Sequence, residues 1–293
     1  MRVAGSPLDL LAADLNDNQA QQAKLLQELS SGSSINAPSD NPTGATQVLE
    51  DTFQKSADTQ YGNNVASLQG QLQTASSALS SISNVLTQAI QLGTEGANGT
   101  MSDSDRQAVA NEIAGIRTQL MGLANTQFQE QYLFGGTATS APPYSADASG
   151  NVTYQGNSGV NSAQISAGQY TPTNVPGSKL FAGSGADMFQ SLADLASALQ
   201  SGQGIAGATT EVQNAFHYVN TQTTFYGSTL SRLNSTSQFL STEETQLTQN
   251  VSAVSGADLA KLSSELDQTS TSTQALTGAA YQVNQMGLIS ILT

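Results

Sequence analysis

The sequence predicts a mainly α-helical protein, in which N- and C-terminal arms form a long antiparallel coiled-coil helical rod with a small β-rich insertion in the middle. Both arms carry apolar stripes at heptad spacing, and the segment between them does not. Only 10% of the 293 residues are charged and 5% are aromatic, whereas roughly a quarter are charged in ordinary domains. This composition suits helical rods, because each turn of a coiled coil buries only one or two side chains.

The most regular stripe lies between residues 61 and 89, where apolar positions recur at alternating steps of four and three. Its members are Tyr61, Val65, Leu68, Leu72, Ala75, Leu79, Ile82, Leu86 and Ala89. The intervening residues are small or polar, whereas a membrane span would be apolar all round. The stripe therefore predicts a long helix that packs against another helix, and no membrane segment.

Three helices are predicted in the N-terminal arm. The first runs from Pro7 to Leu29 and is stopped by Gly32. The second begins at Pro42 behind an Asn41 cap and continues to about residue 91. Glycines at 93, 96 and 99 are expected to break it. A capping pattern at 104–107 starts the third helix, whose stripe is Val109, Ile113, Ile116, Leu120 and Leu123.

The C-terminal arm repeats this layout in reverse. A short helix at 188–199 precedes a long helix from about Thr209 to Val254, and a final helix begins at Leu259. Long helices on either side of an insertion return antiparallel. The predicted domains are therefore residues 1–40 with 256–293, residues 41–136 with 184–255, and the insertion at 137–183. Short β-like runs separated by turn residues fill the insertion, with an expected core of Tyr144, Tyr154, Tyr170 and Phe181.

Charge and cysteine content exclude several classes of function. The net charge is -14, from 8 basic and 22 acidic residues, which argues against nucleic acid or an anionic membrane surface as a partner. The chain has no cysteine, so disulfides, thiolate nucleophiles and cysteine metal sites are excluded. The N-terminal residues lack the apolar run of a cleaved signal peptide.

The sequence offers only weak evidence for a catalytic, metal or phosphate site. His217 is the only histidine, and a metal or catalytic role would need partners. Glu243 and Glu244 point about 100° apart on a helix, so they do not share a site. Residues 102–105 fit helix capping better than calcium binding, and the glycine pairs at 135–136 and 202–204 lack the context of a phosphate loop. No catalytic, metal or cofactor residue is predicted, and no cofactor is expected.

The two terminal stripes are the candidate subunit-packing surface, because these helices have no other globular core to cover. An ordinary monomeric bundle is the alternative. The N-terminal stripe contains two polar members, Asn18 and Gln22, which weaken a coiled coil but fix its register. Such ends are expected to be disordered or loosely helical in the free chain and to order on assembly. The subunit-packing residues are Leu8, Leu11, Leu15, Leu25, Leu29, Leu259, Leu262, Leu266, Leu276 and Val283.

The loop at 31–45 resembles the signature of bacterial flagellins and flagellar hook-associated proteins. The residues that carry the match are Ile35, Asn36, Asp40, Pro42 and Gly44. One position departs, because Asn41 stands where the family usually has a second Asp. The likeness covers both arms, roughly residues 1–135 and 209–293. Residues 132–137, the strand at 152–157 and the C-terminal run at 288–293 are similar to the hook–filament junction branch of that family.

The resemblance implies a structural role in the bacterial flagellum, and no enzymatic activity. It implies export through the flagellar type III apparatus without a cleaved signal peptide, to an extracellular site between hook and filament. The implied partners are copies of the chain in a ring, hook-associated protein 1, flagellin and a flagellar export chaperone.

Three alternatives stay open at this point. A filament flagellin would have the same fold. An enzyme hosted in the insertion would have to use Asp147 and Lys179, the ionisable groups found there. A module for glycans or receptors would use exposed aromatics such as Tyr144 or Tyr170.

Overall fold

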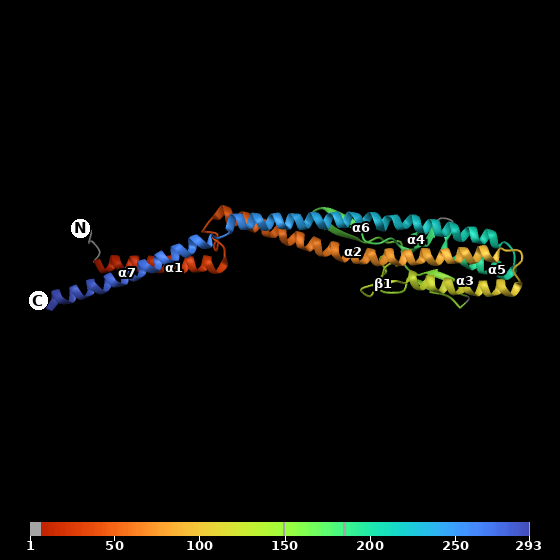
Figure 1. Cartoon of the computed structure of the whole chain (residues 1–293), viewed down its shortest axis with the longest axis horizontal. Helices are drawn as coiled ribbons and strands as arrows, with labels where there is room; N and C mark the ends of the chain where they lie inside the picture. Colours follow the sequence, from red (N-terminus) through yellow and green to blue (C-terminus); the bar gives the residue numbers. More distant parts are fainter. Residues whose placement is uncertain (1–6, 149, 184–185, 293) are drawn as a thin grey trace. The chain divides into compact units, whose positions relative to one another are not determined.

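The computed structural model describes residues 7–148, 150–183 and 186–292. The chain forms two compact units, Met1–Ala57 with Glu243–Thr293 and Asp58–Thr242, called here the terminal unit and the central unit. Long helices belong to both arms, and a small β-containing region lies between them (Figure 1). The predicted fold class is confirmed, whereas the predicted division into three domains stays a prediction.

The N-terminal arm contains α1 (Pro7–Ser31), α2 (Pro42–Gly96) and α3 (Asp103–Ala124). Gly32 ends α1 with a φ of 67°, a left-handed conformation that glycine adopts at little cost. The side-chain oxygen of Asn41 accepts a hydrogen bond from the amide of Gly44 at 3.0 Å, so the predicted cap of α2 is in place.

Two of the glycines expected to break α2 lie inside it. A Cβ added at Gly93 would be 2.5 Å from Thr209 Oγ1, and one added at Gly96 would collide with Leu199. These glycines therefore allow close helix packing, which outweighs their low helix propensity. The expected start of α3 is also wrong, since Ser102 is its N-cap and accepts from the amide of Asp105 at 3.2 Å.

Among the described residues, the middle of the chain contains four two-stranded antiparallel ribbons. They pair β1 (Gln127–Phe128) with β2 (Gln131–Tyr132), β3 (Tyr144–Ala146) with β4 (Val152–Tyr154), β5 (Ser162–Ser166) with β6 (Gln169–Pro172), and β7 (Ala182–Gly183) with β8 (Ala186–Asp187). One short helix, α4 (Gly177–Leu180), lies between β6 and β7.

The core of this region differs in part from the prediction. Tyr144 and Phe181 are buried and their ring centroids lie 5.8 Å apart. Tyr144 also meets Phe189, outside the insertion, at 5.1 Å. Tyr170, expected in the core, is 63% exposed, because side chains alternate along β6 and its neighbour Thr171 points inward.

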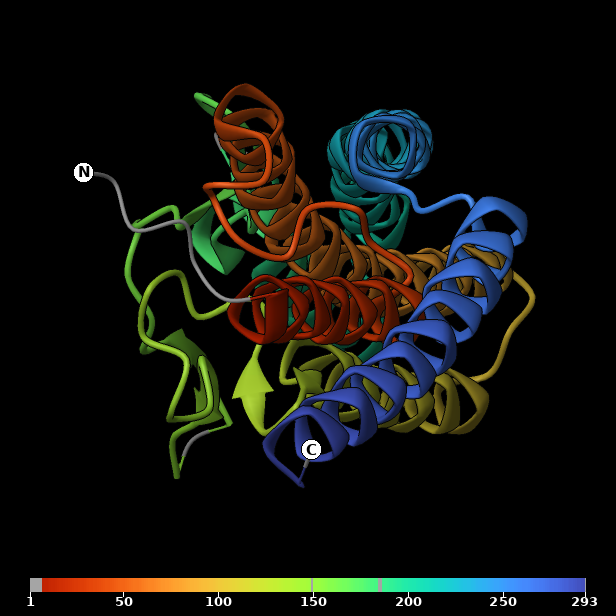
Figure 2. The same ribbon diagram turned by 90° about the vertical axis from the view of Figure 1, so that its left-hand side faces the viewer.

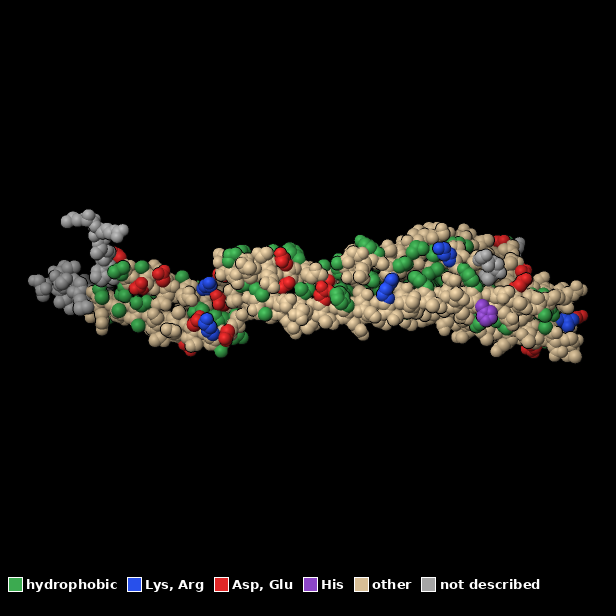
Figure 3. Space-filling view, turned by 90° about the horizontal axis from the view of Figure 1, so that it is seen from above, with side chains coloured by type: hydrophobic (Ala, Val, Ile, Leu, Met, Phe, Trp, Pro, Cys, Tyr) green, Lys and Arg blue, Asp and Glu red, His purple; other side chains and the backbone are tan. Residues whose placement is uncertain are grey.

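The remaining helices are α5 (Met188–Ser201), α6 (Ile205–Ser255) and α7 (Leu259–Leu292). In the central unit, α2, α3, α5 and α6 run alongside one another (Figure 1). The predicted α2 stripe from Val65 to Ala89 is buried there with Val219, Tyr226 and Leu233 of α6 in one core. The surface in Figure 3 carries few charged side chains, as the composition requires.

Candidate assembly site

The terminal unit is built on α1 and α7, which lie antiparallel and side by side (Figure 2). Among their described side chains, Leu25 and Leu262 are buried, at 3% and 6% exposure. Five further predicted stripe residues are half-buried, namely Leu11, Leu15, Leu266, Leu276 and Val283. The two stripes therefore face each other within one chain, but the pair covers them only in part.

A polar contact joins the two helices. Asn18 Nδ2 donates a hydrogen bond to Ser272 Oγ at 2.8 Å. A polar residue at a core heptad position loses its partner when the helices slip, so it specifies register at a cost in stability. Asn18 therefore bonds across the helix pair, and its role in fixing the register stays a prediction.

Not all predicted packing residues lie in this seam. Leu29 and Leu259 are 36% and 53% exposed, because they sit at helix ends beside the connecting loops. The side chain of Leu8 lies outside the described part of the structure. The role of the ten residues in subunit packing stays a prediction.

The pair also exposes apolar side chains on its outer surface. Leu10, Leu26 and Tyr281 are 63%, 48% and 67% exposed. Large contiguous apolar patches mark protein–protein interaction sites, whereas single exposed apolar residues are common on any protein surface. These side chains are accessible to neighbouring helices.

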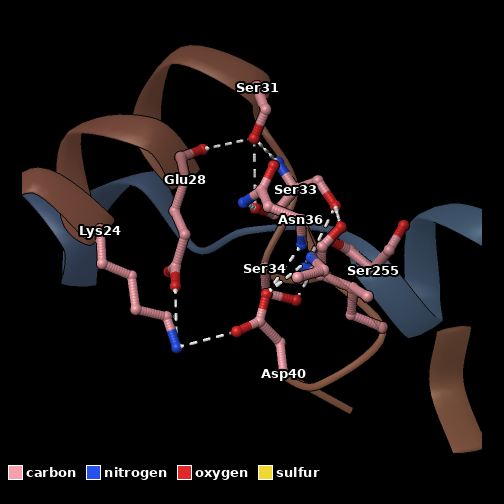
Figure 4. A network of polar contacts seen from close by, with 10 residues as sticks. Lys24, Glu28, Ser31, Ser33, Ser34, Asn36, Asp40 and Ser255 are labelled. Carbon is pink, nitrogen blue, oxygen red and sulfur yellow. Dashed lines mark hydrogen bonds and ion pairs between the residues drawn. The ribbon is translucent and has the colours of Figure 1, made fainter. Parts of the chain in front are cut away.

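The family-signature loop between α1 and α2 is organised by Asp40 (Figure 4). Asp40 Oδ2 accepts hydrogen bonds from the amides of Ala37 at 2.9 Å and Asn36 at 3.1 Å. Asp40 Oδ1 lies 3.2 Å from Lys24 Nζ of α1. These two amides, and then Lys24, hold the pKa of the Asp40 carboxyl below its usual value, because each favours the charged form.

The same loop is bonded to the turn between α6 and α7 (Figure 4). The amide of Ser34 donates to the carbonyl oxygen of Ser255 at 2.7 Å, and the amide of Ala257 donates to that of Gly32 at 3.1 Å. Ser33 and Gly256 thus form a short antiparallel bridge. The signature loop therefore joins the two chain arms inside the terminal unit.

The other signature residues make the loop compact. A Cβ on Gly44 would lie 2.8 Å from Ile35 Cδ1, so glycine leaves room for that side chain. Asn36 Nδ2 donates to the carbonyl oxygen of Ser33 at 2.8 Å, and Pro42 is the first residue of α2. Asn41 supplies the cap oxygen that an Asp would supply, so the departure from the usual signature keeps the cap.

Sequence reasoning missed the partners of this loop. Lys24 lies on α1, directly before the signature loop, and Ser255 ends α6, far along the chain. No local pattern marks either residue as a partner of the loop. The break in the stripe at 255–256 was the one local signal of a special turn at this place. Glycine is needed there, because a Cβ on Gly256 would collide with the carbonyl oxygen of Ser252.

The described residues contain no group of three or more His, Cys, Asp or Glu side chains that could hold a metal ion. Across the same part of the chain, no helix is long and apolar enough to span a bilayer. The side chain of His217 is exposed (Figure 3), with its ring 5.5 Å from that of Phe216. Within the described part of the chain, the candidate site is therefore the surface of the α1–α7 helix pair.

Family comparison agrees with this geometry. Residues 10–139 match the bacterial flagellin N-terminal helical region, and residues 209–292 match the bacterial flagellin C-terminal helical region. Together the two matches cover more than half of the chain. The chain belongs to the bacterial flagellin family. The predicted likeness of both arms to this family is confirmed.

Two curated relatives place the chain within that family. It is 29% identical to flagellar hook-associated protein 3 of Salmonella typhimurium over 168 residues, 57% of this chain. This match spans 52% of the Salmonella protein, about half its length. The chain is also 25% identical to a flagellin of Listeria monocytogenes over 276 residues, which cover 92% of this chain and 91% of the flagellin.

Solved structures have the same fold. The FlgL structure from Bacillus cereus gives a TM-score of 0.61 at 23% identity and covers 69% of this chain and 99% of that chain. A putative flagellar hook-associated protein from Vibrio parahaemolyticus gives 0.61 at 22% identity, with 74% and 97% covered. At such identity the likeness concerns the fold.

Proposed function

We propose that this flagellin-family chain is a hook-associated junction protein, a structural component that links hook and filament in the bacterial flagellum. The observation that carries the proposal is the half-covered seam between α1 and α7. The match to hook-associated protein 3 supports the junction role. We assign the chain no catalytic role.

The mechanism is the burial of apolar helix surface between molecules. A leucine that becomes fully buried contributes about 1.5–3 kcal/mol relative to an exposed one, and several half-exposed leucines lie along the α1–α7 seam. Head-to-tail contacts between copies generate rings or helical assemblies. Copies of the chain in a ring would complete the seam that one chain leaves open.

The proposed neighbours follow from the position between two polymers. We place hook-associated protein 1 on the hook side and flagellin on the filament side, with an export chaperone before assembly. The chain would leave the cell through the flagellar type III apparatus and act outside the cell.

The proposed domain roles use the predicted boundaries. Residues 1–40 and 256–293 would line the inner tube, 41–136 and 184–255 would form the next layer, and 137–183 would face outward. The bonded loop at 31–41 and the turn at 255–257 lie where the first two of these domains meet along the chain.

Imaging of the labelled protein on flagellated cells tests the proposal. We expect a few copies at the base of each filament, and loss of filaments but not hooks when the gene is deleted. Label along the whole filament would contradict the junction role.

Filament flagellin is the second candidate, because the Listeria flagellin matches over 92% of the chain. The purified protein discriminates between the two roles. A flagellin grows long filaments alone or from seeds, whereas a junction protein stops at short assemblies.

A further inference from the structure

Polar side-chain pairs connect α2 and α6 at a regular interval. In the central unit, Gln69 Nε2 donates to Asn234 Oδ1 at 2.8 Å and Ser83 Oγ donates to Asn220 Oδ1 at 2.9 Å. In the terminal unit, Lys55 Nζ donates to Thr248 Oγ1 at 3.0 Å. Successive pairs are 14 residues apart on each helix, which is two heptads. We call the three pairs the polar ladder.

Glycine occupies one side of each position halfway between these pairs. By the same register, Gly62 is opposite Ser241 and Ser76 is opposite Gly227. A Cβ added at Gly62 or Gly227 would meet no described atom within 4 Å. Close packing therefore does not require these glycines, although glycine weakens a helix interior.

The apolar seam between α2 and α6 does not define their alignment by itself. It repeats every seven residues, so a slip of one heptad, about 10.5 Å, again places apolar side chains against apolar side chains. Burial of apolar surface is non-directional, and ion pairs cannot help, since α2 carries no charge between Gly62 and Thr94. Polar pairs beside the seam distinguish one register from the next, as does the close contact of Gly93 of α2 with Thr209 of α6 at one end of the helix pair.

Gly227 makes a slipped register unfavourable in both directions. A slip of one heptad in one direction brings Gln69 opposite Gly227, and a slip in the other direction brings Ser83 opposite it. Glycine has no side chain that could replace the lost partner. The alternation of paired and glycine-containing positions thus separates the native register from its two nearest competitors.

The β5–β6 ribbon bonds to both helices at one place. Asn64 Nδ2 of α2 donates to the carbonyl oxygen of Gln164 at 3.0 Å, and Arg232 of α6 donates to Thr171 Oγ1. These contacts lie near the Gln69–Asn234 pair along both helices. The ribbon is therefore a rival explanation for the alignment.

We propose that the polar ladder selects a single axial register of α6 on α2, and that the glycines between its pairs exclude slips of one heptad. The apolar seam supplies most of the stability of the helix pair. The ladder decides which residues of α6 face which residues of α2.

Cross-linking tests this directly, because the chain contains no cysteine. Gly227→Cys is combined in turn with Ser76→Cys, which reports the native register, and with Gln69→Cys or Ser83→Cys, which report the two slips. Each slip reporter removes one ladder pair and leaves the other two, so every product is compared between backgrounds that carry the same two cysteines. A short bismaleimide is added to dilute protein, and the product is quantified by mass spectrometry. The set is repeated in the Asn220→Ala/Asn234→Ala background and, separately, in an Arg232→Ala background, which removes the contact of α6 with the β5–β6 ribbon.

With the ladder asparagines present, we expect cross-linking in the Ser76→Cys protein and little in the other two. In the double-alanine background, we expect at least a fivefold rise in the slipped products. The matched control is Thr221→Ala/Ser235→Ala, whose hydroxyls bond to carbonyls of their own helix at 3.0 and 3.2 Å. This control should keep the native pattern.

Unchanged cross-linking in the double-alanine background would overturn the proposal, as would an equal rise in the control. Slipped products that appear only with Arg232→Ala would assign the register to the β5–β6 ribbon and overturn it too. Circular dichroism checks that helix content is retained. If the double variant loses helix, Asn234→Ala alone is compared with Ser235→Ala by the same criteria.

Discussion

The central and terminal units use the same heptad pattern but bury it to different degrees. Leu72, Leu79 and Leu86 of α2 are fully buried, because α3, α5 and α6 surround that helix in the central unit. The stripe of α1 rests chiefly on α7, and most of its described members stay half exposed. A heptad stripe therefore predicts that a helix has partners, whereas the number of partners decides how much of the stripe is covered.

The largest expected effect comes from replacing one leucine of each apolar seam with alanine and comparing the loss of stability. Leu86→Ala should lower the free energy of unfolding by about 2–5 kcal/mol, because it leaves a cavity in a closed core. Leu15→Ala should lower it by about 1 kcal/mol or less in the free chain, since that side chain is already half exposed. Urea unfolding followed by circular dichroism measures both. Equal losses would contradict the distinction between the units.

Two glycine-to-alanine substitutions compare a closely packed helix position with an open one. Gly96→Ala should destabilise the central unit by about 1–3 kcal/mol, because its Cβ would collide with Leu199. Gly115→Ala is the matched control on α3, where an added Cβ meets no described atom within 4 Å. It should stabilise the helix by about 0.5–1 kcal/mol. Thermal unfolding measures whether each variant is more or less stable than the parent chain. A Gly96→Ala variant that is more stable would contradict the close contact.

Acid should loosen the terminal unit first at its signature loop. The pKa of Asp40 is lowered in the folded chain from its ordinary value of 3.8, so its contribution is complete above that value. The contribution is lost as the pH falls through the lowered pKa. Hydrogen exchange at the amides of Asn36 and Ala37, corrected for intrinsic rates, should speed up over that range.

Asp40→Asn should remove most of this pH dependence, and Asp14→Asn on α1 is the matched control that should leave it in place. Protection at the two amides that did not change on acidification would contradict the role given to the Asp40 carboxylate.

The smallest effect is expected at the surface of the β-containing region. Tyr170→Ser should change stability by less than about 0.5 kcal/mol, because this side chain is 63% exposed. It should also leave assembly with neighbouring copies unchanged. A loss of assembly measured by light scattering would show that this region takes part in subunit contacts.

Local signals predicted much of the fold. The stripe at 61–89, the Asn41–Pro42 helix start and the Gly32 stop need only residues within a few turns of one another, and the structure places them as expected. The packing role of Gly96 could not be predicted from local signals, because it depends on contact with Leu199, more than 100 residues away.

The candidate site shows the same limit. The signature loop was recognisable from its own residues, but Lys24 and Ser255, which bond to it, lie on other helices. The exposure of Tyr170 depended on the pairing phase of β6, which the short β-like runs did not determine. The sequence predicted that the two arms pair, but it did not predict the individual side-chain contacts between elements.

Hydrogen exchange of the free chain and of the assembled chain tests the central claim most directly. Residues 11–29 and 262–283 should exchange rapidly in dilute monomer and become protected on assembly, whereas residues 65–89 should be protected in both states. Full protection of the α1–α7 pair in dilute monomer would contradict the claim that neighbouring molecules complete its seam.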